Sequence, residues 1–385
     1  MNRRVFLCTA AAAGFRTIAR AQPPSVPDAI RSLRPMTAGI QPITDAERRA
    51  RVEKARRLMH ENKIGAVVME GGSSAFYFTG SRSDGLFVLP LRGEILSLAR
   101  EYSAIASALK DNGVAAGRVG IEERVHFDVI DGVGKLAPAL EFTSADPVTA
   151  GCRMIKSPAE IALMQRANDI TIAAYRAALG SLKEGMTQRE LSANIAAAYH
   201  ALGVQGGAMA IFGKYTAFPH GSVQPQQLRE GDLVLIDDGC SVEGYQSDIT
   251  RTVIFGQPTA RQRQIWALER KAQDAALAAA QPGASCESVD AAARKVITDA
   301  GFGPGYKVPG LPHRTGHGIG LDGHEWTYLV RGNQTRLKPG MCFSDEPTIA
   351  IYGEFGVRLE DCMYITEDGA RMFTKQSPAI DQPFG

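Results

Sequence analysis

Cysteine is scarce in this 385-residue chain, and its spacing excludes two classes of protein. The six cysteines are Cys8, Cys152, Cys240, Cys286, Cys342 and Cys362. No two of them form a CxxC pair, so we expect neither a disulfide framework nor a zinc knuckle. Buried free thiols are the preferred interpretation, with one disulfide as the alternative in an oxidising compartment.

An excess of charge of either sign is also missing. The formal net charge is +2, which gives no basic surface of the kind that drives binding to nucleic acid. Residues 1–21 contain four arginines and no acid, so the rest of the chain is slightly acidic. We therefore expect no nucleic-acid partner.

The apolar run at the amino terminus, Val5–Phe15, is too short to span a bilayer, which takes about 20 residues. It follows an arginine pair at positions 3 and 4 and precedes Ala-Arg-Ala at positions 19–21, a small-x-small cleavage site. This order resembles the twin-arginine export signal of bacteria. It predicts an exported protein, periplasmic or extracellular, without stable membrane insertion. The alternative is a cytosolic tail with a chance arginine pair.

The remaining composition is that of an ordinary folded protein, with 44% hydrophobic and 22% charged residues. This length suits two domains. Residues 22–43, rich in proline and serine, are predicted to be a linker or a wrapping arm. Between residues 44 and 155, helices at 44–62 and 103–111 alternate with short apolar strands at 66–69, 86–89, 95–98 and 119–121. This alternation predicts a small α/β domain.

Residues 156–385 are predicted to form a second, α+β domain. Ser157 and Thr187 each begin a capping box, which predicts two helices, and strands are expected at 233–237 and across 244–255. Helix signals then return at Thr259 and after Gly283, followed by further strand-like segments. The order helix, helix, strand pair thus occurs twice, although the two halves do not align as sequence. We interpret it as a duplicated unit.

Acidic residues close several apolar segments of this second domain. Asp237 ends the strand that begins at Leu233, where a carboxylate is costly unless it is paired or bound to metal. Asp248 lies eleven residues later, and a hairpin would bring both carboxylates to one face. Each aspartate alone is more simply a turn former or a salt-bridge partner. Glu346 and Glu360 also follow apolar segments.

Histidines gather in the same half of the chain. His313, His317 and His324 fall within twelve residues, with four glycines between them that leave the backbone open to a ligand. Carboxylates mixed with one imidazole suit Mn²⁺, Co²⁺, Fe²⁺ or Zn²⁺. Five such ligands are enough for two ions about 3.5–4 Å apart, which would make hydroxide available near neutral pH. A lone histidine would more often be structural.

The order Asp237, Asp248, His317, Glu346, Glu360 resembles the Asp-Asp-His-Glu-Glu site of the pita-bread metallopeptidase family, which holds methionine aminopeptidase, aminopeptidase P and prolidase. Residues 244–252, 313–324 and 356–361 are similar to its signatures, and the likeness runs over about residues 44–375. It implies a pita-bread catalytic domain at 156–385. It also implies two divalent metal ions, most readily Mn²⁺, with Co²⁺, Fe²⁺ and Zn²⁺ as alternatives.

The resemblance further implies a role for each ligand. Asp237 would bind one ion, and His317 with Glu346 would bind the other. Asp248 and Glu360 would bridge them. Glu346 would also take a proton from the attacking water as general base.

The resemblance extends to residues that would meet the substrate. His220 and His324 would contact the scissile peptide and steady the tetrahedral intermediate. His313 would line the pocket for a proline ring. Arg358 would orient Glu360 or a neighbouring acid.

Residues 77–80 and 117–122 resemble the creatinase/prolidase amino-terminal domain, which methionine aminopeptidases lack. This implies an Xaa-Pro aminopeptidase or Xaa-Pro dipeptidase that acts on peptides, and a homodimer. Gly323, Trp326 and Thr348 depart from the family pattern; they remove no ligand but would reshape the substrate pocket. The alternatives are a creatinase-like hydrolase and a non-catalytic binding module, both of which lose metal ligands. Dipeptides and longer substrates are not distinguished.

Overall fold

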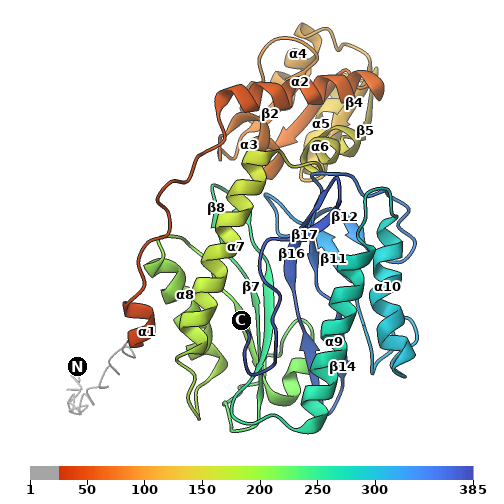
Figure 1. The fold of residues 1–385 in the computed structure, drawn as a ribbon. Coiled ribbons are helices and arrows are strands. Elements are labelled where there is room, and N and C mark those ends of the chain that lie inside the picture. The colour runs from red at the N-terminus through yellow and green to blue at the C-terminus, as the bar shows by residue number, and fades with distance from the viewer. Residues whose placement is uncertain (1–25, 385) are drawn as a thin grey trace, which may run out of the picture.

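The structure, a computed structural model, describes residues 26–384 (Figure 1). The predicted export signal at residues 1–21 lies outside the described residues. An amino-terminal α/β part, drawn orange to yellow, sits at one end of a larger part, drawn green to blue. Within residues 26–384, no helix combines the length and the apolar composition that crossing a membrane requires.

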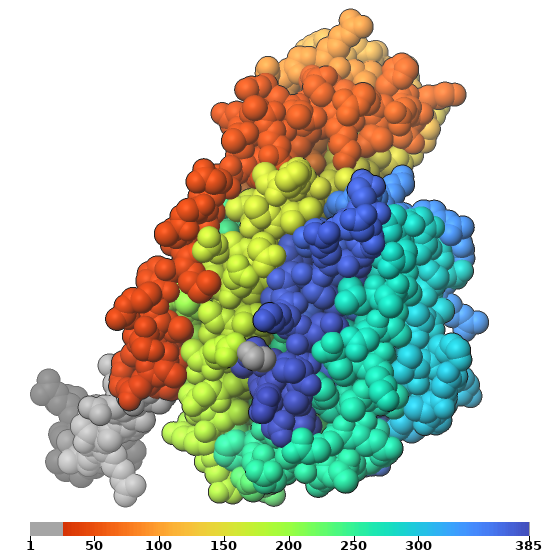
Figure 2. Space-filling model, in the orientation of Figure 1, coloured from red at the N-terminus to blue at the C-terminus, as the bar shows by residue number. Residues whose placement is uncertain are grey.

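Residues 26–43 lie along the larger part of the molecule and contain the short helix α1 (Asp28–Arg31). Figure 2 shows them, in red, running down the flank of the yellow-green segment. Ile30 and Ile43 are buried, and the Met36 amide donates to the Leu202 carbonyl over 2.9 Å. These contacts hold the segment against the end of helix α8 (Gln188–Ala201).

The amino-terminal part is built on a five-stranded mixed sheet in the order β3-β2-β1-β4-β5. Strand β1 pairs antiparallel with β2 and parallel with β4. Five helices surround the sheet. The elements are α2 (Asp45–Glu61), β1 (Ala66–Glu70), α3 (Ser73–Thr79), β2 (Leu86–Pro90), β3 (Leu96–Leu98), α4 (Tyr102–Asp111), β4 (Gly117–Ile121), α5 (Phe127–Leu136), β5 (Leu140–Ser144) and α6 (Asp146–Arg153).

Both faces of this sheet are covered, which explains why β1 and β2 are apolar along nearly their whole length. Ala66 and Val68 of β1 pack in a cluster that includes residues of α4 and α5. Val67 and Met69 point to the opposite face, where the core continues into α2, α6 and the carboxy-terminal part. Successive side chains of a strand alternate between the faces, so β1 serves two cores at once.

The carboxy-terminal part repeats one order of elements, helix, helix and then strands. Ser157, Thr187 and Thr259 each form a capping box at a predicted helix start, and Ser285 caps the fourth helix. The first half has α7 (Pro158–Leu179), α8, β6 (Met209–Phe212), β7 (Leu233–Asp238), β8 (Ser241–Val242), β9 (Tyr245–Gln246) and β10 (Ile249–Ile254). The second has α9 (Ala260–Ala279), α10 (Cys286–Asp299), β11 (Gly316–Gly318), β12 (Glu325–Leu329), β13 (Cys342–Asp345), β14 (Thr348–Ile351), β15 (Phe355–Arg358), β16 (Asp361–Thr366) and β17 (Gly369–Met372).

These strands form the central layer, and the two helix pairs lie over it (Figure 1). The hydrogen-bonded orders are β10-β7-β6, β12-β11-β13-β16-β17 and β14-β15. The predicted strand at 244–255 is interrupted: Asp248 lies in the break between β9 and β10. The break frees the Asp248 backbone from the ladder, and its amide instead faces the Cys362 sulfur at 3.4 Å.

Buried ion pairs join the two parts of the molecule. Arg51 of α2 lies 3.4 Å from Glu160 of α7, and both contact the Tyr245 hydroxyl. A second contact centres on Asp322, which accepts hydrogen bonds from Ser73 at 2.5 Å and from Arg153 at 2.6 Å. Asp322 precedes His324 by two residues, so this contact ties a candidate site loop to the amino-terminal part.

All five cysteines that the structure describes are buried and free. The preferred interpretation, free thiols, is confirmed for these five, and Cys8 lies outside the described residues.

Candidate active site and metal centre

One cavity of about 170 Å³ collects every candidate residue of the sequence analysis. Its wall comes from both halves of the carboxy-terminal part, so no single segment could form it. Arg314 is the one lining residue that the sequence analysis did not single out. The lining residues are His220, Asp237, Asp248, His313, Arg314, His317, His324, Glu346, Arg358 and Glu360.

Strand pairing brings Asp237 and Glu360 together through Thr250. Thr250 lies opposite Asp237 in the β7–β10 register. Its hydroxyl lies 2.5 Å from Asp237 Oδ1 and 2.7 Å from Glu360 Oε2. Arg358 donates from Nε to this hydroxyl over 3.1 Å and from Nη2 to Asp237 Oδ2. Arg358 therefore contacts Asp237 directly, through an ion pair. It also contacts the Thr250 hydroxyl, which lies between Asp237 and Glu360.

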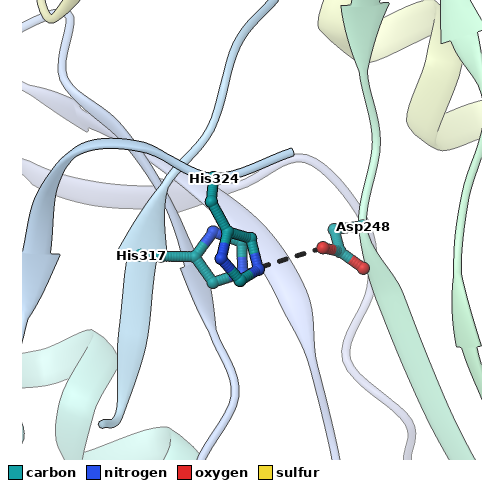
Figure 3. Close-up of side chains that lie close together, drawn as sticks. All are labelled: Asp248, His317 and His324. Carbon is teal, nitrogen blue, oxygen red and sulfur yellow. Dashed lines mark ion pairs between the residues drawn. The ribbon is translucent and has the colours of Figure 1, made fainter. Parts of the chain in front are cut away.

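His317 presents one ring nitrogen to the acids. Its Nδ1 lies 3.1 Å from the Gly318 carbonyl, which can only accept, so Nδ1 carries the proton. Nε2 is therefore unprotonated, and its lone pair is available to bind a metal ion. It lies 3.3 Å from Glu346 Oε1 and 3.7 Å from Asp248 Oδ2. Figure 3 shows the ring directed at Asp248.

Three groups of side chains each bring ligand atoms close enough to hold one cation. The first is Asp237, Asp248 and Glu360, and the second is His317, Glu346 and Glu360. They share Glu360. The third joins Asp248 and His317 with His324, whose ring lies 3.9 Å from that of His317, centre to centre (Figure 3).

Three acids of the cavity have raised pKa values, because burial disfavours their charged forms. Burial raises the pKa of Asp248 and of Glu360 well above ordinary values, and neighbouring carboxylates raise both further. Burial raises the pKa of Glu346 to about 7, an effect that Arg358 opposes and Asp237 increases. A nearby positive charge would oppose these shifts and favour the ionised carboxylates.

The histidines show the opposite shift. Burial, together with the neighbouring His324, lowers the pKa of His317 to about 3. Burial and Arg358 lower the pKa of His313 to about 3. Both rings are neutral at physiological pH, the form in which imidazole binds metal.

His313 and His324 differ in what they can offer a ligand. His313 uses both nitrogens internally: Nδ1 donates to the Arg314 carbonyl at 2.6 Å, and Nε2 accepts from the Thr348 hydroxyl at 2.9 Å. His324 accepts at Nδ1 from Arg314 over 2.9 Å, and an arginine can only donate. The proton of the neutral His324 ring is therefore on Nε2. His313 offers a ring face, whereas His324 offers an N–H.

The donor set fits divalent cations. Glu360 Oε1 is buried and has no hydrogen-bond partner among the described residues, although such atoms are normally satisfied. Oxygen donors with one unprotonated imidazole nitrogen suit Mn²⁺, Fe²⁺, Co²⁺ or Zn²⁺. The same positive charge would reverse the pKa shifts of the acids.

Two residues at the site were not predicted from the sequence: Arg314 in the cavity wall, and Thr250, whose hydroxyl lies between Asp237 and Glu360. Thr250 lies inside a signature segment, two residues after Asp248, and this position was the available signal. Its contact with Glu360 joins residues 110 positions apart, which the sequence alone does not indicate. Arg314 directly follows His313, so its position in the histidine-glycine segment was the available signal.

An α+β pita-bread architecture with carboxylates and one imidazole converging between its halves defines a class of metal-dependent hydrolases. The sequence profile of metallopeptidase family M24 matches residues 162–367 of the chain. The chain belongs to this family and is a metallopeptidase that takes divalent metal ions.

Individual relatives support this assignment. The chain is 32% identical over 348 residues to a protein of Pyrococcus furiosus named Xaa-Pro dipeptidase, covering 84% of this chain and 97% of that one. The solved structure of the dipeptidase PepE from Mycobacterium ulcerans superposes with a TM-score of 0.79 at 29% identity, covering 89% and 99% of the two chains. A dipeptidase structure from Pyrococcus horikoshii gives 0.78 at 29% identity, covering 84% and 98%. The predicted α+β pita-bread fold is confirmed.

Proposed function

We propose that this metallopeptidase hydrolyses the Xaa-Pro bond at the amino terminus of peptides with two bound divalent ions. The observation that carries the proposal is the pair of side-chain groups that share Glu360. Two adjacent cation positions with a common carboxylate are the arrangement of a dinuclear site. The Xaa-Pro preference rests on the relatives named Xaa-Pro dipeptidase.

The residues that would hold the ions follow from these groups. Asp237 would bind the first ion, and His317 with Glu346 would bind the second. Asp248 and Glu360 would bridge, since Asp248 also lies 3.7 Å from His317 Nε2. Mn²⁺ is the favoured metal, with Co²⁺, Fe²⁺ and Zn²⁺ as alternatives. Bound divalent ions would acidify a water and so supply hydroxide near neutral pH.

The chain's own residues would do the rest. Glu346, whose pKa burial raises to about 7, would accept the proton of the attacking water. His324 would donate its Nε2–H to the scissile carbonyl oxygen as that oxygen gains charge, and the exposed His220, which lines the same cavity, would assist. The ring face of His313 would line the proline pocket. Arg358 would keep Asp237 oriented.

The test is hydrolysis of Ala-Pro and Ala-Pro-Ala by the metal-stripped protein, with and without Mn²⁺, followed by mass spectrometry. Asp248→Asn removes a candidate bridge, and Asp368→Asn is the matched control, since Asp368 is 88% exposed. We expect alanine release with Mn²⁺ from the wild type and the control, and none from Asp248→Asn. Cleavage that is equal without metal, or absent from both peptides, contradicts the proposal.

The two alternatives require a different site. A creatinase-like hydrolase and a non-catalytic binding module would both have lost metal ligands, whereas all five candidate ligands line one cavity. Stoichiometric divalent metal in the purified protein, measured by mass spectrometry of the elements, therefore separates the proposal from both.

Export and assembly belong to the same proposal. Residues 1–21 would direct the folded protein through the twin-arginine route to the periplasm, and the mature protein would act as a homodimer. Replacing Arg3 and Arg4 with lysine should abolish export, assayed by cell fractionation. Light scattering of the purified protein should give twice the chain mass.

A further inference from the structure

Arg314 carries an unneutralised positive charge into the cavity. Its guanidinium Cζ lies 4.8 Å from the centre of the Tyr328 ring, and Nη2 donates to His324 over 2.9 Å. Within residues 26–384, Arg314 takes part in none of the arginine–carboxylate ion pairs, and its buried Nε has no hydrogen-bond partner. Arginine in a partly buried position normally pairs with an acid. This one retains most of its donors for another molecule.

Arg358, the other arginine of the cavity, has its hydrogen-bond donors occupied by groups of the protein. Arg358 donates to Asp237, to the Thr250 hydroxyl and to the Pro219 carbonyl at 3.1 Å. Its charge and its donors are used within the protein. Arg314, by contrast, donates only one hydrogen bond, and its acceptor is the neutral imidazole of His324. The unmet partner of Arg314 is therefore expected to be an anion that enters the cavity.

The position of Arg314 identifies that anion. Arg314 touches His324, which under the proposed function contacts the scissile peptide, so the anion must lie close to that bond. In an Xaa-Pro dipeptide, the free carboxylate is attached to the proline Cα next to the scissile bond. In a longer peptide, a neutral amide takes that place, and the carboxylate lies at least about 3.5 Å farther along the chain. A guanidinium fork matches a carboxylate in shape and charge.

We propose that Arg314 binds the free α-carboxylate of the prolyl residue and so selects dipeptides over longer peptides. This inference rests on the proposed function and assigns a substrate size to the same site. The Tyr328 ring, whose centre lies 4.8 Å from the guanidinium carbon, and the hydrogen bond to His324 together restrict the position of the guanidinium. Pre-orientation of this kind reduces the ordering cost of binding.

The test compares Ala-Pro, its carboxamide and Ala-Pro-Ala in the Mn²⁺-loaded wild type, Arg314→Gln and Arg314→Lys. Arg371→Gln is the matched control, because the Arg371 side chain is 63% exposed and remote from the cavity wall. A charged hydrogen bond of this kind sets the expected loss: kcat/KM for Ala-Pro should fall about 10- to 100-fold in Arg314→Gln. For the carboxamide, the same change should alter kcat/KM by no more than about threefold. Lysine keeps the charge but not the fork, so Arg314→Lys should fall between.

A binding measurement separates recognition from turnover. Calorimetric titration of the loaded protein with L-proline and with prolinamide should give tighter binding of proline in the wild type and equal binding in Arg314→Gln. Melting temperature and metal content establish that each variant is folded and loaded. An equal loss on Ala-Pro and on its carboxamide would overturn the inference, because Arg314 would then act through His324. Failure of the wild type to cleave any of the peptides would instead refute the proposed function.

Discussion

Replacing Glu346 with glutamine removes one titrating group from the cavity, and its effect on stability should depend on pH. In the metal-free chain, burial raises the pKa of Glu346 from 4.5 to about 7. A group whose pKa is raised by folding stabilises the folded state fully below its unfolded pKa, and this stabilisation is lost as the pH rises through the folded pKa. Between pH 5 and pH 8, the wild type should lose roughly 2–3 kcal/mol more of its unfolding free energy than Glu346→Gln.

The comparison between the two proteins is essential because the histidines titrate in the opposite sense. His313 and His317, with pKa values lowered to about 3, add stability above pH 6.5 that is lost as the pH falls. Their contribution is common to both proteins and cancels in the difference.

Urea unfolding in the presence of a chelator, followed through tryptophan fluorescence, measures this difference. Trp266 of α9 is 5% exposed and packs in the same buried cluster as Phe343 and Leu359, so it reports unfolding of the part that carries Glu346. A difference that stays constant from pH 5 to pH 8 would show that Glu346 titrates normally. It would refute the electrostatic account of the cavity.

Three further predictions concern the same cavity. In the wild type, Mn²⁺ at 100 times its dissociation constant should stabilise the fold by about 3 kcal/mol, and its affinity should rise with pH, measured by calorimetry between pH 6 and pH 8. Thr250→Val keeps the shape but removes the hydroxyl between Asp237 and Glu360, so Mn²⁺ affinity should fall about 10- to 100-fold; unchanged affinity would dismiss the link. Asp322→Asn weakens the tie to the amino-terminal part, so unfolding free energy should fall by about 1–3 kcal/mol. Because the loss of this contact should displace His324, the kcat of the Asp322→Asn variant on Ala-Pro should also fall. Its metal content should equal that of the wild type.

Local signals in the sequence predicted much of the fold. The capping boxes at Ser157, Thr187 and Thr259 place three helix starts to the residue, because a cap is a contact between residues three apart. Strand positions followed from short apolar runs, and acids that close such runs indicated the site. The first strand of the amino-terminal part was predicted to end at Met69 and ends at Glu70, since strand ends depend on neighbours as well as on composition.

What the sequence could not supply is the partner of each residue across the chain. The shared hydroxyl of Thr250 depends on β10 lying between Asp237 and Glu360, and Asp322 meets Ser73 across 249 residues. Periodicity tells which face a side chain takes, but not which other face it meets. Arg314 shows the same limit, since its contact with His324 depends on how the glycine-rich segment folds back.

The charges of the cavity impose an order on binding. When all four carboxylates are ionised, the two arginines leave an excess of two negative charges, which would repel the carboxylate of a peptide. Two divalent cations would turn this into an excess of two positive charges and leave Arg314 free to attract that carboxylate. Substrate should therefore bind only after metal, and L-proline should show no measurable binding to the stripped wild type. Burial is the largest cause of the raised pKa values of Asp248 and Glu360, and repulsion among the carboxylates adds to it; protonation of these two acids would lower the same excess of negative charge.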